Sequence, residues 1–159
     1  MKTLGVIPAR WQSTRLPGKS LVQLCGKPLV AWVVEGALRA RRLDEVIVAT
    51  DDERIGRVAE DAGARAVMTS PDHASGTDRV AEAIADTPCE LIVNIQGDEP
   101  LIEGGLIDRL VADLSAHPDW DMITVGVPIA SADDAAKPSI TKVVCDAEGR
   151  ALYFSRLPI

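Results

Sequence analysis

The chain has 159 residues, of which 47% are hydrophobic and 26% charged; this composition excludes a mainly disordered protein and suits one domain over residues 1–159. Its net charge of −7 excludes a general nucleic-acid binder, because contacts to phosphate groups set that affinity. No apolar run reaches the roughly 18 residues of a membrane helix, and the apolar N-terminus ends at Pro8, too early for a signal peptide. We therefore expect a cytoplasmic protein without a membrane partner.

Short apolar runs alternate with segments of helical periodicity. The runs that predict strands are Thr3–Pro8, Glu45–Thr50, Arg65–Thr69, Leu91–Gln96 and Met122–Ile129. Between them, apolar residues recur three and four positions apart and predict helices around 29–40, 55–62, 77–84 and 106–114. Gly63 suits the end of the second helix, and Thr77 or Asp78 the cap of the third. This alternation predicts an α/β fold with a mostly parallel sheet covered by helices on both faces.

The pattern changes after the fifth predicted strand. Ile140–Cys145 and Ala151–Phe154 flank a polar turn and predict a β-hairpin or a bulged pair. The chain then stops at Ile159 without a polar ending, and we expect a longer C-terminal part to be missing. The three cysteines are Cys25, Cys89 and Cys145. They are widely spaced in mostly apolar surroundings, which predicts reduced, buried thiols and no zinc site.

Basic residues concentrate near the N-terminus. Residues 1–42 carry eight basic side chains and one acidic one, whereas the rest of the chain carries nine basic and 23 acidic ones. A basic segment in an acidic chain indicates a small anionic ligand. The loop Pro8–Lys19 follows the first predicted strand and holds Arg10, Arg15 and Lys19 with no acid among them. We interpret it as a phosphate-binding loop; a solvated basic loop is the alternative. A P-loop is excluded, because Ser13 stands where that motif requires glycine.

Two further segments follow predicted strands at the edge where parallel sheets bind ligands. In Asn94–Pro100, Asp98 is placed to hold Mg²⁺, which takes one or two protein carboxylates together with substrate phosphates; a capping role for Asp98 is the alternative. In His73–Arg79, glycine and hydroxyl residues precede a helix and can contact a base or phosphate; taken alone, these residues slightly favour the alternative, an ordinary helix N-terminus. Asp51 and Asp52 suit either a helix cap or a ligand contact.

Taken together and in order, these motifs resemble the 3-deoxy-manno-octulosonate cytidylyltransferase (CMP-KDO synthetase) family. The segments that carry the resemblance are Ile7–Lys19, Val48–Asp52, His73–Arg79, Val93–Pro100, Lys142–Val144 and Ala151–Arg156. The resemblance implies a Rossmann-like nucleotidyltransferase fold and a homodimer. It also implies that the anomeric hydroxyl of KDO attacks the α-phosphorus of CTP, giving CMP-KDO for lipopolysaccharide synthesis and pyrophosphate.

The same resemblance implies roles for individual residues. The catalytic residues would be Arg10, Lys19 and Asp98, with Asp98 holding Mg²⁺. Residues around the nucleotide would be Ala9, Arg10, Arg15, Lys19, Ser75, Gly76, Arg79 and Gln96. The acid sugar would be approached by Gln96 and Arg156. Family members continue past this chain with a second metal-binding aspartate, so the activity of these 159 residues alone is open. Two alternatives also remain: CMP transfer to 8-amino-KDO or sialic acid, and a non-catalytic nucleotide-binding protein.

Overall fold

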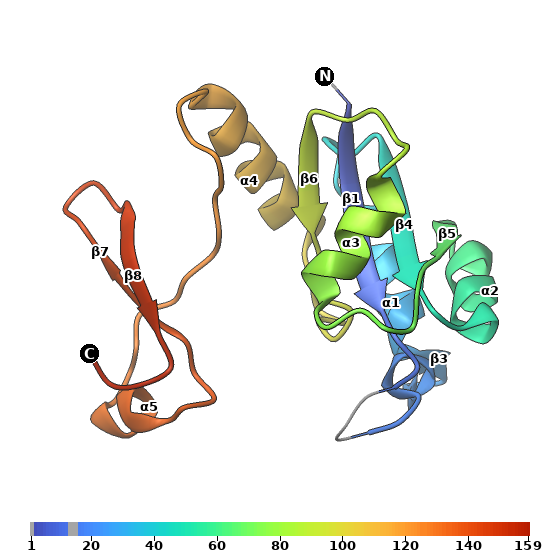
Figure 1. Cartoon of the computed structure of the whole chain (residues 1–159), viewed down its shortest axis with the longest axis horizontal. Coiled ribbons are helices and arrows are strands. Elements are labelled where there is room, and N and C mark those ends of the chain that lie inside the picture. The colour runs from blue at the N-terminus through green and yellow to red at the C-terminus, as the bar shows by residue number, and fades with distance from the viewer. Residues whose placement is uncertain (1, 13–15) are drawn as a thin grey trace. The chain divides into compact units, whose positions relative to one another are not determined.

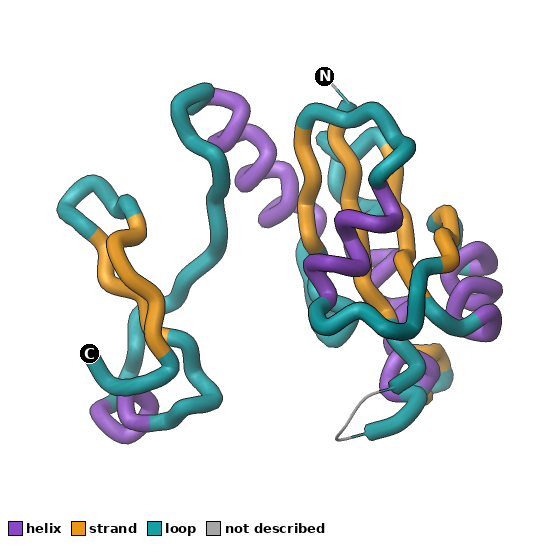
Figure 2. The backbone as a smooth tube through the Cα atoms, in the orientation of Figure 1, coloured by secondary structure: helices purple, strands orange, loops and turns teal. Residues whose placement is uncertain are grey.

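The computed structural model describes residues 2–12 and 16–159. The chain divides into two compact units, Met1–Asp121 and Met122–Ile159, which are taken one at a time below. Figure 1 labels their elements, and Figure 2 distinguishes helices, strands and loops. Within the described part of the chain, no helix is both long and apolar enough to cross a membrane.

A parallel sheet of four strands forms the centre of the first unit. In spatial order the strands are β5 (Arg65–Met68), β4 (Glu45–Thr50), β1 (Thr3–Ala9) and β6 (Leu91–Asn94). Every pairing is parallel, with Ala9 of β1 opposite Thr50 of β4 and Val6 of β1 opposite Asn94 of β6. The predicted parallel α/β fold is therefore confirmed. In this order β1 lies between β4 and β6. The loop that follows β1 therefore starts beside the carboxyl ends of both neighbouring strands.

Helices cover both faces of this sheet, as Figure 1 shows. They are α1 (Leu29–Ala37), α2 (Glu53–Asp61), α3 (Gly76–Ile84) and α4 (Gly104–Ala116), preceded by a short 3₁₀ helix at Lys19–Leu21 and the small strand pair β2 (Gln23–Leu24) and β3 (Lys27–Pro28). Ile7 and Val48 of the sheet pack with α1, α2 and α4 on one face. Leu4 and Ile47 pack with α3 on the other. Because both faces of the two central strands are covered, β1 and β4 are almost entirely buried, whereas the edge strands β5 and β6 stay partly exposed.

Local chemistry accounts for where two of these helices begin. The Asp52 side chain caps α2 by accepting from the Arg54 main-chain N–H at 2.9 Å. The third helix is capped by Ser75, which forms a reciprocal capping box with Asp78. The predicted cap at Thr77 or Asp78 is therefore wrong, because a capping box places the acidic residue three positions inside the helix rather than at its start.

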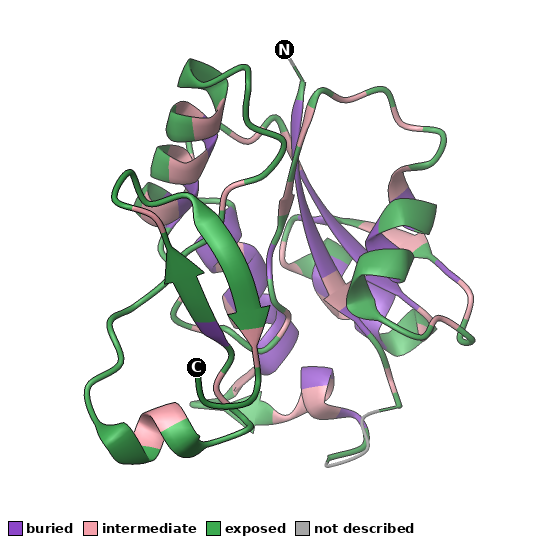
Figure 3. Ribbon diagram, turned by 60° about the vertical axis from the view of Figure 1, so that its left-hand side comes forward, coloured by how far each residue is buried: buried purple, intermediate pink, exposed green. Residues whose placement is uncertain are grey.

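The second unit contains α5 (Ala132–Ala136) and the antiparallel hairpin β7 (Lys142–Cys145) and β8 (Ala151–Ser155). The register shifts between Val144 and Cys145, which confirms the predicted bulged pair. Figure 3 shows both strands of the hairpin as largely exposed. The strand predicted at Met122–Ile129 is wrong: this segment is exposed and has no strand assignment in the structure, because an apolar run forms a strand only where another strand accepts its main-chain bonds.

The cysteines correct one further expectation. All three are free thiols, as predicted, but Cys25 and Cys145 are exposed and Cys89 is half-buried. Cys25 lies in the turn between β2 and β3, and Cys145 ends β7 beside the bulge. Both cysteines are at the surface because the turn and the hairpin that carry them are exposed. Apolar neighbours in the sequence therefore did not predict burial at these two positions.

Candidate active site

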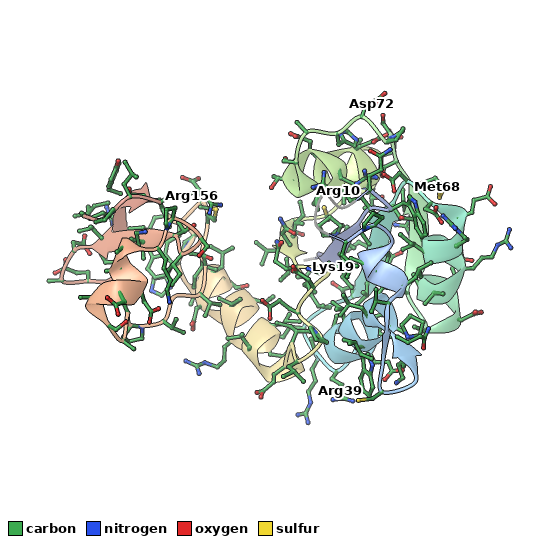
Figure 4. The ribbon with its side chains drawn as sticks, turned by 90° about the horizontal axis from the view of Figure 1, so that it is seen from below. Arg10, Lys19, Arg39, Met68, Asp72 and Arg156 are labelled. Atoms are coloured by element: carbon green, nitrogen blue, oxygen red, sulfur yellow. The ribbon has the colours of Figure 1, made fainter. Side chains whose placement is uncertain are left out.

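A pocket of about 380 Å³ opens at the carboxyl edge of the parallel sheet. Its lining comes from the end of β1 and the loop that follows it, the turn after β6, and the N-terminus of α3 with the residues just before it. The lining residues are Pro8, Ala9, Arg10, Leu16, Lys19, Ser20, His73, Ser75, Gly76, Arg79, Gln96, Gly97 and Asp98. Figure 4 views this edge of the molecule from below, with Arg10 and Lys19 labelled. The structure thus brings together eight residues that the sequence nominated separately.

Opposite charges meet inside this pocket. The Lys19 Nζ donates to the Asp98 Oδ2 at 2.5 Å, and both side chains are about half exposed. An ion pair with this exposure contributes roughly 0–1 kcal/mol to stability, so the two groups are readily drawn to other partners. A bound phosphate would attract Lys19, and a cation carried by that phosphate would attract Asp98. The pair therefore suits an anion that arrives with a divalent cation.

The turn that carries Asp98 lies against the end of β1. A Cβ atom on Gly97 would lie 2.7 Å from the carbonyl oxygen of Pro8, a separation that real Cβ contacts do not show. Only glycine permits this approach, which fixes Asp98 beside the exit of β1. A glycine directly before Asp98 is thus explained by the close packing of the turn after β6 against the end of β1.

The third wall is the start of α3. Ser75 and Gly76 lie at its N-terminus, where the positive end of the helix dipole favours an anion. The capping box already engages the main-chain N–H groups of Ser75 and Asp78. His73 precedes them and is hydrogen-bonded to Glu82 in the next turns of the helix. That hydrogen bond, together with one from the Ser70 main chain, holds the pKa of Glu82 below its ordinary value. His73 is thereby fixed at the rim of the pocket by a carboxylate.

Arg79 also reaches the pocket wall, but its guanidinium is already engaged. It donates to the Thr69 Oγ1 at 2.5 Å and to the Asp51 Oδ2 at 3.1 Å, and only 2% of its side chain is exposed. Its positive charge is therefore already paired with Asp51 inside the protein. Sequence reasoning placed Arg79 beside the nucleotide without finding these two partners. The signal for them was the position of Asp51 and Thr69 directly after two adjacent parallel strands.

One nominated residue is not described by the structure, and another belongs to the second unit. Arg15 falls outside the described residues. Arg156 belongs to the second unit, where its Nη1 donates to the Pro138 carbonyl at 3.3 Å. The roles given to the residues of this site, including Ala9, Gln96 and Arg10, stay predictions that geometry alone does not test.

The donors of the pocket fit a hard divalent cation. Among the described residues there is no group of three or more histidine, cysteine, aspartate or glutamate side chains that could form a metal cage. Asp98 instead offers one carboxylate next to a basic wall that would hold phosphate. Mg²⁺ is commonly bound in this way, by one or two carboxylates with phosphate oxygens and water completing its shell.

Comparison with known proteins supports one interpretation of the whole chain. A cytidylyltransferase family model matches residues 4–159. The 3-deoxy-manno-octulosonate cytidylyltransferases of Bdellovibrio bacteriovorus and Geobacter sulfurreducens are 52% and 49% identical over 159 residues; this is 100% of this chain and 64% of each relative. A solved CMP:2-keto-3-deoxy-manno-octonic acid synthetase, complexed with CTP, superposes with a TM-score of 0.88 at 41% identity, over 100% of this chain and 66% of that one. The chain thus spans about 64% of the length of these curated relatives.

Proposed function

The chain belongs to the cytidylyltransferase family, and from this premise we propose that the whole protein transfers CMP from CTP to the anomeric hydroxyl of KDO, releasing pyrophosphate. The observation that carries the proposal is the pocket at the carboxyl edge of the sheet, where Arg10, Lys19 and Asp98 converge. The product would serve lipopolysaccharide synthesis. A cytoplasmic homodimer is part of the proposal and rests on the resemblance.

The residues of the pocket supply binding and charge neutralisation rather than covalent chemistry. Arg10 presents a planar, bidentate donor to phosphate oxygens, whereas Lys19 adds a compact charge. Both would reduce the negative charge that repels an attacking hydroxyl oxygen from the α-phosphorus. Gln96 and the start of α3 would hold the nucleotide and sugar so that the reacting atoms stay close, which converts a bimolecular step into an effectively intramolecular one.

We propose Mg²⁺ as the cofactor, with Asp98 as its ligand in this chain. When bound, Mg²⁺ supplies Lewis-acid stabilisation of charge on the phosphate oxygens. The Asp98 carboxylate would exchange its partner Lys19 for the cation, and Lys19 would turn to the phosphates. Each of the two side chains then keeps an opposite charge beside it.

A pyrophosphate-release assay tests this function. Protein expressed from the complete reading frame, with CTP, KDO and MgCl₂, should release pyrophosphate and form CMP-KDO. Replacing CTP by ATP, or omitting MgCl₂, should abolish release. Replacing KDO by sialic acid or 8-amino-KDO decides between the acid sugars. CTP binding without any product would favour the non-catalytic alternative, and sedimentation of the same protein tests the homodimer.

A further inference from the structure

Trp11 lies two residues after the end of β1, and both of its main-chain polar groups are hydrogen-bonded. The Trp11 N–H donates to the Asp51 Oδ1 at 2.8 Å. The Trp11 carbonyl accepts from the Gly18 N–H at 2.9 Å, so the chain is closed on itself just before Lys19. Arg10 immediately precedes one of these anchor points and Lys19 immediately follows the other. Arg10 and Lys19, two of the cations that line the pocket, are therefore attached next to the same pair of bonded main-chain positions.

The Trp11 ring adds a second brace. The Arg54 guanidinium carbon lies 3.6 Å from the ring centroid, a cation–π contact. The ring also packs against Gly18, where a Cβ atom would come within 2.8 Å of ring carbons. Gly18 has a φ of 68°, the left-handed region that glycine tolerates. The tight fit of ring and glycine sets how closely the returning chain approaches Trp11.

Asp51 holds this arrangement to the rest of the unit. Its side chain is 5% exposed, and its second oxygen accepts from Arg79, which is 2% exposed and also bonded to Thr69. The chain of contacts thus runs from α3 through the end of β4 to the end of β1. Buried groups with satisfied bonds keep one position, whereas exposed ones do not.

We propose that Asp51 and Trp11 are positioning residues for the phosphates of the nucleotide. Neither residue lines the pocket. They hold Arg10 and Lys19 at the place where the phosphates bind, so that the loop is already ordered before CTP arrives. Ordering a loop at the moment of binding lowers affinity, and bracing it beforehand restores that affinity. The inference rests on the proposed function, because it takes the pocket to bind CTP.

The first test replaces Asp51 by Asn. The Trp11 N–H and Arg79 donate to different oxygens of Asp51. In asparagine an NH₂ group, which donates and cannot accept, takes the place of one of these oxygens, so one of the two bonds is lost. The control is Asp44→Ala. Asp44 accepts from the Thr3 N–H at 2.7 Å, the same kind of bond at the opposite end of β1, and alanine removes it completely.

The readout is calorimetric titration with CTP in MgCl₂, using protein from the complete reading frame. We expect Asp51→Asn to raise the Kd for CTP at least tenfold with unchanged stoichiometry, and Asp44→Ala to change it less than twofold. A merely structural role would lower the stoichiometry, through loss of folded protein, and leave the Kd of the remainder unchanged.

A second pair of variants avoids the buried ion pair. Gly18→Ala pushes a methyl group into the Trp11 ring, whereas Gly26→Ala places the same group, at a similar φ of 80°, where no atom lies within 4 Å. Both variants carry the same backbone strain, so we expect only Gly18→Ala to raise the Kd for CTP.

The outcomes are separable. Wild-type protein that binds no CTP overturns the proposed function, and this inference with it. Wild-type binding with an unchanged Kd in both Asp51→Asn and Gly18→Ala overturns the inference alone. An equal rise in Kd for Asp44→Ala, or for Gly26→Ala, also overturns it, because the effect would then not depend on Trp11.

Discussion

The two central strands of the first unit's sheet are buried on both faces, whereas the hairpin of the second unit is exposed along most of both strands. Leu4, Val6 and Ile47 have no exposed surface, but Leu152 and Tyr153 are 63% and 60% exposed. Both regions are rich in β-branched and aliphatic side chains, and β8 adds the aromatic Tyr153 and Phe154. Apolar strands are therefore not a core by themselves: the first unit buries its strands because helices cover both faces.

The second unit is organised around a polar group instead. Lys142 is 4% exposed, and its Nζ donates to the main-chain carbonyls of Lys137, Ile140 and Arg156 at 3.0, 2.9 and 2.6 Å. These bonds join the segment before β7 to the segment after β8. A buried ammonium with three acceptors has all its donors satisfied. The first unit thus buries apolar side chains, whereas the second joins the two ends of its hairpin through the buried Lys142 ammonium as well as the strand pairing.

The largest difference should appear when a leucine is truncated in each unit. We expect Leu4→Ala in β1 to lower the free energy of unfolding by about 2–5 kcal/mol, because it leaves a cavity in a filled core. Leu152→Ala in β8 should change it by less than about 0.5 kcal/mol. Urea unfolding followed by tryptophan fluorescence measures the first, since Trp11, Trp32 and Trp120 all lie in the first unit. Amide exchange measures the stability of the hairpin in Leu152→Ala. A loss of stability as large as that caused by Leu4→Ala would show that both units depend equally on their leucines.

Removing the Lys142 ammonium should affect the second unit alone. Lys142→Met roughly keeps the length of the side chain but leaves three carbonyl groups without their donor. We expect the free energy of unfolding of the second unit to fall by about 1.5–3 kcal/mol. Amide hydrogen exchange of β7 and β8 should accelerate while the fluorescence transition of the first unit stays in place. Lys137→Met is the control, because the Lys137 side chain is 56% exposed and pairs only at the surface with Asp134. Unchanged exchange in Lys142→Met would show that the hairpin does not depend on this cation.

Ligand binding should separate the units as well. Lys19→Ala should weaken CTP binding by about 1.5–3 kcal/mol, roughly ten- to a hundredfold, through loss of a charge-assisted phosphate contact. Arg156→Ala in the second unit should leave the Kd for CTP unchanged and raise the KM for KDO. Lys27→Ala is the control for the first variant, because Lys27 pairs with Glu35 outside the pocket. Calorimetry and steady-state kinetics distinguish the two, and a loss of CTP binding in Arg156→Ala would contradict the assignment of the sugar to this side chain.

The smallest effect concerns acid stability of the first unit. Hydrogen bonding to Arg65, and to a lesser degree to Lys2, holds the pKa of Glu45 below its ordinary value. A lowered folded pKa adds stability that is complete above the unfolded pKa, about 4.3 for glutamate, and is lost as the pH falls below that value through the folded one. Glu45→Gln should flatten the fall in melting temperature over this acidic range and leave the melting curve of β7 and β8 unaltered. If the melting temperature of Glu45→Gln falls with pH as steeply as that of the wild type, other carboxylates cause the loss of stability in acid.

Sequence reasoning succeeded where a feature depends on near neighbours in the chain. Glu45–Thr50 was predicted with the observed bounds because an unbroken apolar run between turn residues suits a strand buried on both faces. Lys19, in the basic loop after the first strand, and Asp98, after the fourth predicted strand, were expected at one edge of the sheet, and the structure places both in the same pocket; their roles stay predictions. The fold class followed from the same periodicity.

Tertiary structure alone decided which partners each side chain has. The sequence offered Asp51 equally as a cap or a ligand contact, and the fold assigned it to Trp11 and Arg79, which lie 40 and 28 positions away. Met122–Ile129 has a strand-like sequence but lacks strand pairing in the structure, and Lys142 became buried because three carbonyls surround it. Periodicity records which residues avoid water. The partner of a hydrogen bond or an ion pair depends on distances across the fold, and no local pattern encodes those distances.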